Sequence, residues 1–244
     1  LISADNKLLE IVYDTCVKKQ GKLIIPSFSV GRTQEIVYTL NNFYNEGKLP
    51  KIEVYVDSPL AINATEVFRM HPECFNKDIL NVMLYDPDPF VFNTLHYIRS
   101  VEDSKKLNYI EGPCIIISAS GMMEAGRVKH HLANNISKPS TTVLAVGYCA
   151  PETLGAKLLK GAKQVSIHGN LYDVHARIEK IDSYSGHADY KEILEFLKCQ
   201  NPSEVKQVFL VHGDYDAQLN LKKELENIGF ANIFIPEKNE EFII

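Results

Sequence analysis

The sequence predicts an α/β fold with a mostly parallel, Rossmann-like sheet. Short apolar runs of strand length recur along the chain, and each is followed by a glycine-containing turn and a stretch whose apolar residues have helical spacing. Strand, turn and helix repeated in this order are typical of a parallel sheet covered by helices. With 244 residues, 45% of them hydrophobic, the chain can bury the core of one large domain or two modest ones.

The N-terminal elements alternate in this way. Residues 8–17 carry apolar side chains at helical spacing, and residues 22–26 predict a short buried strand. A second helix is expected over residues 31–47, which begin and end with glycine. Further strands are expected over residues 52–56, 114–118 and 142–146.

The later segments depart from the regular alternation of strand, turn and helix. Residues 70–113 contain four prolines and predict short helices and irregular structure. Residues 164–168 and 175–181 alternate like strands on either side of Gly169-Asn170, which predicts a hairpin. The last part is expected to form helix, strand, helix and strand over residues 189–199, 205–211, 217–228 and 232–235. A boundary near Asp182 would separate a domain of residues 1–182 from residues 183–244.

Composition narrows the function classes. The longest apolar runs are far shorter than the about 18 residues of a membrane helix, so no membrane partner is expected. The five cysteines form no CxxC pair, which favours a reducing, cytoplasmic setting. The net charge is -5, so any polyanion must be held locally rather than by the charge of the whole chain. The chain begins without Met or a signal peptide, and we expect it to be the rear portion of a longer protein.

Three turns rich in small and hydroxyl side chains follow predicted strands. They span residues 27–33, 57–61 and 118–123. Helix N-termini beyond the carboxyl ends of parallel strands bind phosphates, so Ser29, Ser118, Ser120, Gly121 and Met122 are candidate ligand contacts. The alternative is that the hydroxyls only cap helices and the glycines only permit the turns.

Two charged residues in these turns have competing interpretations. Arg32 could donate a bidentate pair of hydrogen bonds to a phosphate, or it could form an ion pair with Glu35. Asp57 could be an acid or a metal ligand, but Asp before Ser-Pro is also a common helix cap, which we favour.

Two of the eight histidines occupy glycine-containing turns between predicted elements. His187 comes just before the capping-box pattern of residues 189–192, and His212 ends the apolar strand 208–211. A turn histidine is often only solvated, but these positions suit a catalytic or metal-binding side chain. The other six histidines are expected to be structural or surface residues.

The order of six motifs resembles the β-CASP nucleases, a branch of the metallo-β-lactamase fold. The likeness is greatest to the group around the cleavage and polyadenylation endonuclease and its bacterial and archaeal relatives. The motifs are PSFSVGRTQE (26–35), VDSPLA (56–61), SASGMM (118–123), VGYC (146–149), SGHAD (185–189) and VHGD (211–214). The fold expected from this resemblance is a Rossmann-like β-CASP domain over residues 1–182, followed by the C-terminal return of a metallo-β-lactamase αββα domain, the RNA-specificity segment, over residues 183–244.

The resemblance implies a zinc-dependent ribonuclease with RNA as its substrate. His187 corresponds to the motif B histidine beside the scissile phosphate, a catalytic residue, and His212 to the motif C histidine, a zinc ligand. The turns that contain Ser29, Arg32 and Ser118 to Met122 would line the RNA cleft. The resemblance also implies two zinc ions in the intact enzyme. It leaves open whether the protein forms a homodimer.

The sequence also departs from the family. The His-Xaa-His-Xaa-Asp-His zinc motif and further acidic and histidine ligands are absent, and we expect them in a missing N-terminal portion of the same protein. One imidazole holds zinc poorly, since a site takes three or four protein ligands. The chain alone is therefore expected to be catalytically inert. A non-catalytic RNA-binding or scaffold homologue, which intact His187 and His212 argue against, and a small-molecule phosphohydrolase are the alternatives.

Overall fold

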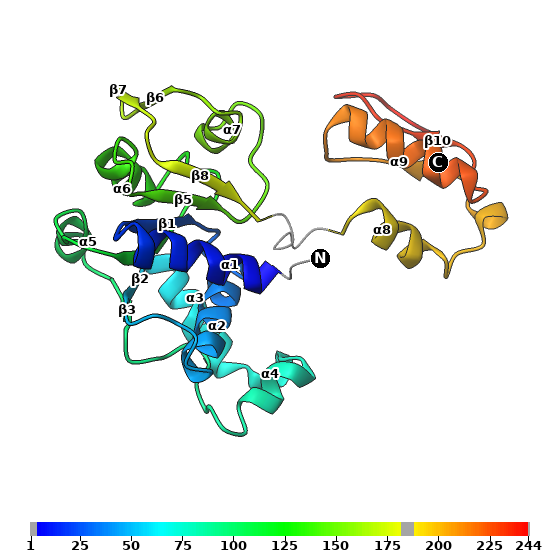
Figure 1. The fold of residues 1–244 in the computed structure, drawn as a ribbon. Coiled ribbons are helices and arrows are strands. Elements are labelled where there is room, and N and C mark those ends of the chain that lie inside the picture. The colour runs from blue at the N-terminus through cyan, green and yellow to red at the C-terminus, as the bar shows by residue number, and fades with distance from the viewer. Residues whose placement is uncertain (1–3, 182–187, 244) are drawn as a thin grey trace. The chain divides into compact units, whose positions relative to one another are not determined.

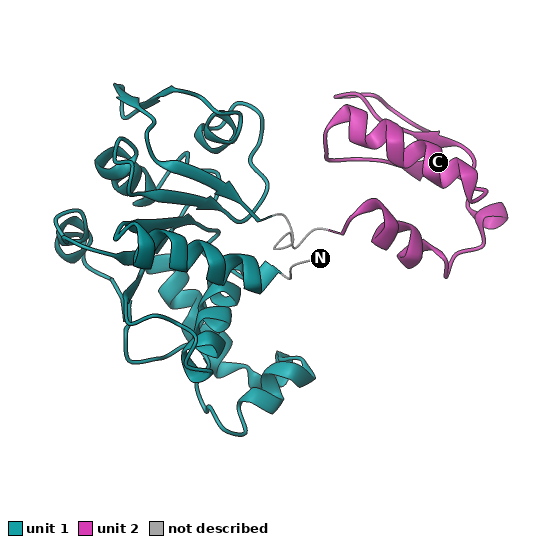
Figure 2. Ribbon diagram, in the orientation of Figure 1, with its two compact units in different colours: residues 1–185 teal, residues 186–244 magenta. Residues whose placement is uncertain are grey.

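A computed structural model describes residues 4–181 and 188–243 (Figure 1). The chain divides into two compact units, residues 1–185 and residues 186–244 (Figure 2). The boundary predicted near Asp182 lies outside the described residues, and so does His187. The two units are described separately.

Unit 1 is built on a six-stranded sheet in the order β3-β2-β4-β1-β5-β8. Its strands are β1 (Lys22–Pro26), β2 (Glu53–Asp57), β3 (Leu95–Tyr97), β4 (Cys114–Ser118), β5 (Thr142–Ala145) and β8 (Arg177–Lys180). Every neighbouring pair in this sheet is parallel, which confirms the predicted α/β class.

Helices cover both faces of the sheet (Figure 1). They are α1 (Ala4–Val12), continued by a π-helical turn (Tyr13–Lys18), then α2 (Arg32–Asn45), α3 (Pro59–Met70), α5 (Val101–Leu107), α6 (Val128–Asn135) and α7 (Leu154–Leu159). The short helix α4 (Lys77–Val82) projects away from the sheet and buries none of its residues (Figure 1). Successive side chains of a strand point to opposite faces. In β1, Leu23 and Ile25 pack with α1, α2 and α3, whereas Ile24 packs with α6 and α7.

One strand pairing differs from the prediction. β6 (Gln164–Ile167) forms an antiparallel hairpin with β7 (Asn170–Asp173), not with residues 175–181. His168 and Gly169 make the turn with positive φ angles of 52° and 80°. A two-residue turn requires the partner strand to follow at once, so the hairpin closes on β7. β8 pairs with β5 instead and is an edge strand of the described sheet.

Unit 2 contains a strand–helix–strand motif preceded by a helix. Its elements are α8 (Tyr190–Leu197), a 3-10 turn (Pro202–Glu204), β9 (Val208–Phe209), α9 (Tyr215–Asn227) and β10 (Ile233–Phe234), with β9 and β10 parallel. The predicted capping box is confirmed, since Asp189 and Glu192 exchange backbone–side-chain hydrogen bonds of 2.9 Å. The order of elements agrees with the prediction, although both strands are shorter. None of the described helices is long and apolar enough to cross a membrane.

Candidate nucleic-acid interface

The turns after β1, β2, β4 and β5 lie at one edge of the sheet, because these strands all run in the same direction. Ser118 at the end of β4 is in register with the last residues of both β1 and β2. The backbone N–H of Ser27 donates to the carbonyl of Ser118 at 3.0 Å. The hydroxyl oxygens of Ser29 and Ser58 lie 3.2 Å apart. The structure therefore joins turns that are far apart in the sequence into one carboxyl edge.

This edge has the topology of a ligand site. The helices after β1 and β2 pack on one face of the sheet, and those after β4 and β5 pack on the other. Neighbouring strands whose connections leave in opposite directions form a crevice beyond their carboxyl ends. The N-termini of α2 and α3 begin at this edge, where the helix dipoles favour an anion. Some of their first N–H groups are already used, since Arg32 and Thr33 donate to the carbonyls of Val30 and Phe28, and Ala61 donates to Ser58 Oγ.

Asp57 is not the helix cap that the sequence favoured. Ser58 occupies the N-cap of α3, with Pro59 at the first helical position, and its hydroxyl accepts from the backbone N–H of Ala61 at 3.3 Å. The side chain of Asp57 is fully buried. The capping interpretation of Asp57 was therefore wrong, because the neighbouring serine already fills that role.

Asp57 instead centres a buried acid cluster, which we define as Asp57, Ser104, Arg127 and His131. Its carboxylate accepts from Arg127 Nη1 at 2.7 Å, from Ser104 Oγ at 2.6 Å and from His131 Nε2 at 2.6 Å. The other ring nitrogen of His131 lies 3.0 Å from Asn108 Oδ1. Burial raises the pKa of Asp57, but the hydrogen bonds from His131, Ser104 and Arg127 outweigh it, so the pKa lies below its ordinary value.

Ser118 belongs to the same interior. Its side chain is 1% exposed, and its hydroxyl donates to the carbonyl of Asp57 at 2.8 Å. This burial contradicts the predicted contact of Ser118 with substrate. The residue ties the end of β4 to the end of β2.

Arg32 forms the ion pair that the sequence had left as one of two possibilities. Its guanidinium contacts the carboxylate of Glu35 within the first turn of α2, and its side chain is only 11% exposed. Burial raises the pKa of Glu35, and the charge of Arg32 opposes this rise. A phosphate contact by Arg32 would have to compete with this pair.

The turns after β1, β4 and β5 form an open part of the edge. Phe28 is 45% exposed and lies against the backbone of Gly121, where a β-carbon would come within 3.0 Å of ring atoms Cδ2 and Cε2. A β-carbon on Gly147 would lie 3.8 Å from Cε2. We call Phe28 with these two glycines the glycine-backed platform. Tyr148, the next residue, is 50% exposed.

The other predicted contact residues surround this platform. Ser29, Ser120 and Met122 are partly exposed. The carbonyl of Met122 accepts from the backbone N–H of Gly155 at 3.2 Å, which fixes the turn against α7. The third turn is longer than predicted, because α6 begins only at Val128.

Two lysines that the sequence did not single out lie at the β8 end of the edge. Lys7 Nζ donates to the carbonyl of Lys180 at 2.7 Å. Lys180 is in register with Ala145, the last residue of β5, and its charge acts on the thiol of Cys149. Burial raises the pKa of that thiol, and Lys180 opposes the rise. These lysines add positive charge beside the turns of a chain that is acidic as a whole.

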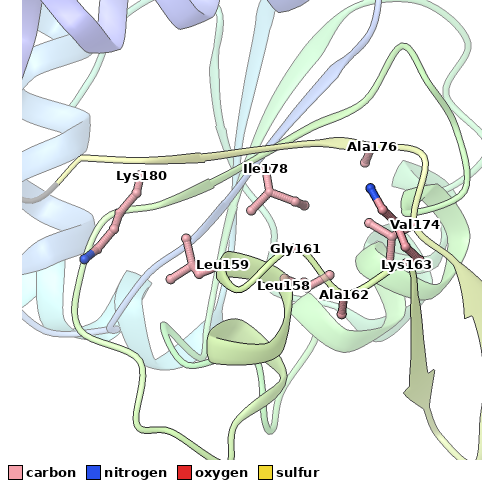
Figure 3. A pocket seen from close by; sticks show the side chains of 9 residues that line it. All are labelled: Leu158, Leu159, Gly161, Ala162, Lys163, Val174, Ala176, Ile178 and Lys180. Atoms are coloured by element: carbon pink, nitrogen blue, oxygen red, sulfur yellow. The ribbon is translucent and has the colours of Figure 1, made fainter.

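Lys180 also lines a pocket of about 510 Å³ between α7 and β8 (Figure 3). Leu158 and Leu159 of α7 form one wall, and Ile178 lies across from them. Lys163 and Lys180 lie toward opposite ends of this pocket. The pocket thus extends away from the turns along the edge strand.

The proposed metal-binding histidine lies in unit 2. His212 is exposed in the turn between β9 and α9 and has a φ angle of 66°, in the left-handed region, followed by Gly213 at 139°. Within the described ranges, no group of three or more His, Cys, Asp or Glu side chains could hold a metal ion. The described residues alone therefore do not fit a zinc site.

Comparison with known protein families assigns both parts of the chain. The Beta-Casp domain matches residues 33–158, which cover most of the parallel sheet and its helices. The Zn-dependent metallo-hydrolase RNA specificity domain matches residues 171–236, from β7 in unit 1 into unit 2. The predicted resemblance is therefore confirmed.

Individual relatives support the same family. The chain is 33% identical over 221 residues to Ribonuclease TTHA0252 of Thermus thermophilus, covering 90% of this chain and 49% of that protein. It is 30% identical over 240 residues to the transcription termination factor FttA of Methanosarcina mazei (93% and 37%), and 32% identical over 232 residues to an RNase J-like protein of Methanocaldococcus jannaschii (95% and 52%). The chain thus spans about a third to a half of the length of these relatives. With the family match over more than half of its residues, this chain belongs to the β-CASP family of the metallo-β-lactamase fold.

Proposed function

We propose that this chain supplies the RNA-binding β-CASP part of a zinc-dependent ribonuclease that hydrolyses phosphodiester bonds. The observation that carries the proposal is the convergence of four turns and two helix N-termini at the carboxyl edge of the sheet, in a chain matched by an RNA specificity domain. The name of the Thermus relative, a ribonuclease, supports the same reaction class.

In this proposal the RNA backbone lies along the carboxyl edge. Backbone N–H groups of the turns and the hydroxyls of Ser29 and Ser120 donate to phosphate oxygens, and Gly121 and Met122 contribute contacts from the turn after β4. Lys7 and Lys180 supply the local positive charge that the whole chain lacks. Arg32 contributes only if a phosphate displaces Glu35 as its partner.

The roles of the two turn histidines belong to the proposal as well. We assign His187 to the scissile phosphate and His212 to a zinc site whose other ligands lie outside the described residues, in an N-terminal portion of the same protein. When bound, two zinc ions would supply a hydroxide nucleophile and stabilise the charge of the transition state. We also propose a cytoplasmic location for the protein and leave open whether it forms a homodimer.

The test is hydrolysis of a labelled single-stranded RNA by the full-length protein. We expect cleavage that a chelator abolishes and zinc restores, with nucleoside monophosphates left intact. His212→Ala should lose more than the about 10- to 100-fold that removal of an outer partner of a metal ligand costs. His71→Ala, an exposed histidine of unit 1, is the matched control. RNA binding without cleavage would support the scaffold alternative, and preferential hydrolysis of monophosphates the phosphohydrolase alternative.

A second candidate function comes from the names of the archaeal relatives. Proteins called transcription termination factor FttA match over 86–96% of this chain. We infer that the RNA could be a transcript still bound to its polymerase. Release of that transcript on addition of the full-length protein would favour this role, and cleavage of free RNA alone would count against it.

A further inference from the structure

The turn after β1 holds an aromatic ring, Phe28, that is open to solvent over nearly half of its surface. It directly follows the buried Ser27. One side of the ring is occupied by Gly121, whose missing β-carbon leaves the space that the ring fills. Gly147 of the neighbouring β5 turn provides a second small residue beside the ring. The ring is therefore fixed along its Cδ2–Cε2 side by the two glycines, while nearly half of the side chain stays open to solvent.

The surroundings of this ring are those of a nucleotide site. Phosphates are held by backbone N–H groups, hydroxyls and cations, and unstacked bases are held by aromatic faces. The platform has Ser29 one residue away, Ser120 beside Gly121, and the helix N-terminus of α2 directly after the turn. A protein-binding hot spot would instead be an aromatic anchor within a larger apolar core. Only Val30 extends the exposed apolar surface within this turn.

We propose that Phe28 on its glycine backing stacks an unpaired RNA base next to the phosphate-binding turns. The inference rests on the proposed function and adds to it a specific contact, the stacking of one base on Phe28, which requires an unpaired base because a base within a duplex does not expose its face. Stacking on a ring is tolerant of base identity, so the site would position RNA without reading its sequence.

The experiment compares two oligonucleotides of equal length and charge, an oligouridine and its abasic ribose-phosphate counterpart. Affinity of the full-length protein for each is measured by fluorescence anisotropy, with a chelator present to stop hydrolysis. Phe28→Ala should lower the affinity for oligouridine by about 5- to 150-fold and leave that for the abasic oligomer unchanged. Phe28→Trp should retain the binding of oligouridine, and Phe196→Ala, an exposed phenylalanine of unit 2, should change neither.

The outcomes separate this inference from the function on which it rests. If the wild-type protein binds both oligomers and Phe28→Ala binds them equally well, or weakens both equally, the stacking role is wrong while RNA binding stands. Loss of a protein oligomer in Phe28→Ala with an unchanged preference for bases would show a protein-docking surface instead. If the wild-type protein binds neither oligomer, both the function and the stacking role fail.

Discussion

The two halves of the carboxyl edge differ in the charge and exposure of their side chains. On the β2 side, the buried acid cluster holds a carboxylate and an imidazole in the interior and joins them by direct hydrogen bonds to the partly exposed guanidinium of Arg127. On the β1 and β5 side, the glycine-backed platform presents a neutral ring, backbone groups and small side chains to solvent. The register of β4 between β1 and β2 joins the two halves.

This difference indicates a division of roles within one edge. Charges that are satisfied inside the protein stabilise the turns but have little capacity left for a ligand. Neutral donors and an open ring contribute little to stability but can bind a nucleotide. The comparison predicts that substitutions in the buried acid cluster act on stability, and those in the open half act on RNA affinity.

The largest effect is expected for Asp57→Asn. The substitution removes the charge that balances Arg127 and an oxygen that accepts from His131 Nε2 inside unit 1, and it should lower the free energy of unfolding by about 3 kcal/mol. Urea denaturation followed by circular dichroism measures the change. Asp103→Asn, an exposed aspartate of α5, is the control and should change it far less, because solvent screens its ion pair with Lys106. A similarly small loss for Asp57→Asn would remove the stability role of the cluster.

A somewhat smaller loss of stability is expected for Gly126→Ala. This variant tests whether the two halves of the carboxyl edge affect stability and RNA binding independently. The new β-carbon would lie 2.4 Å from the carbonyl oxygen of Ala119, and the φ angle of 78° adds strain. We expect a loss of about 2 kcal/mol, together with weaker RNA binding, because the β4 turn serves both halves. Gly112 also has a positive φ angle, but a β-carbon there would meet no atom within 4 Å. The difference in the free energy of unfolding between Gly126→Ala and Gly112→Ala therefore measures the cost of the clash. Unchanged RNA affinity in a destabilised Gly126→Ala would show that the halves act independently.

The pH dependence of stability gives a third test. The pKa of Asp57 lies below its ordinary value of 3.8 in the folded protein, so its contribution to stability is present above pH 3.8 and is lost as the pH falls through the folded pKa. Wild-type protein should therefore lose more stability than Asp57→Asn when the pH is lowered through this range. Parallel curves for the two proteins in acid denaturation would contradict the assignment.

The smallest effect is expected for Lys180→Ala, which changes affinity without changing specificity. Loss of one phosphate contact should weaken RNA binding uniformly across sequences and reduce the slope of log affinity against log salt by about 1. Lys51→Ala, an exposed lysine just before β2 at the opposite edge of the sheet, should leave the slope unchanged. An unchanged slope for Lys180→Ala would exclude Lys180 from the RNA path.

The sequence predicted the strands and turns well because their signals are local. Apolar runs, glycines and the capping box at Asp189 act over a few residues, and the structure places them as expected. The hairpin was mispaired because alternation in residues 175–181 suits an edge strand as well as a hairpin strand. Whether such a strand pairs in the hairpin or at the edge of the sheet depends on contacts that are distant in the sequence.

The site was predicted less completely, for a physical reason. Asp57 meets Arg127 and His131 across 70 and 74 residues of chain, and no local pattern reveals such a contact. Phe28 lay inside a recognised motif, but its exposure depends on Gly121 and Gly147 from two other strands. Ser118 was chosen for its hydroxyl, and only its register between two strands shows that this group is buried.

The edge strand β8 has a consequence for the behaviour of this protein in concentrated solution. Within the described structure it pairs with β5 alone, which leaves a row of backbone donors and acceptors that another chain could extend. Three of its four residues are charged, Arg177, Glu179 and Lys180, with Ile178 between them. The cost of removing these charged groups from water disfavours strand addition by a second molecule. Neutralising them should turn this boundary of the sheet into a nucleus for aggregation.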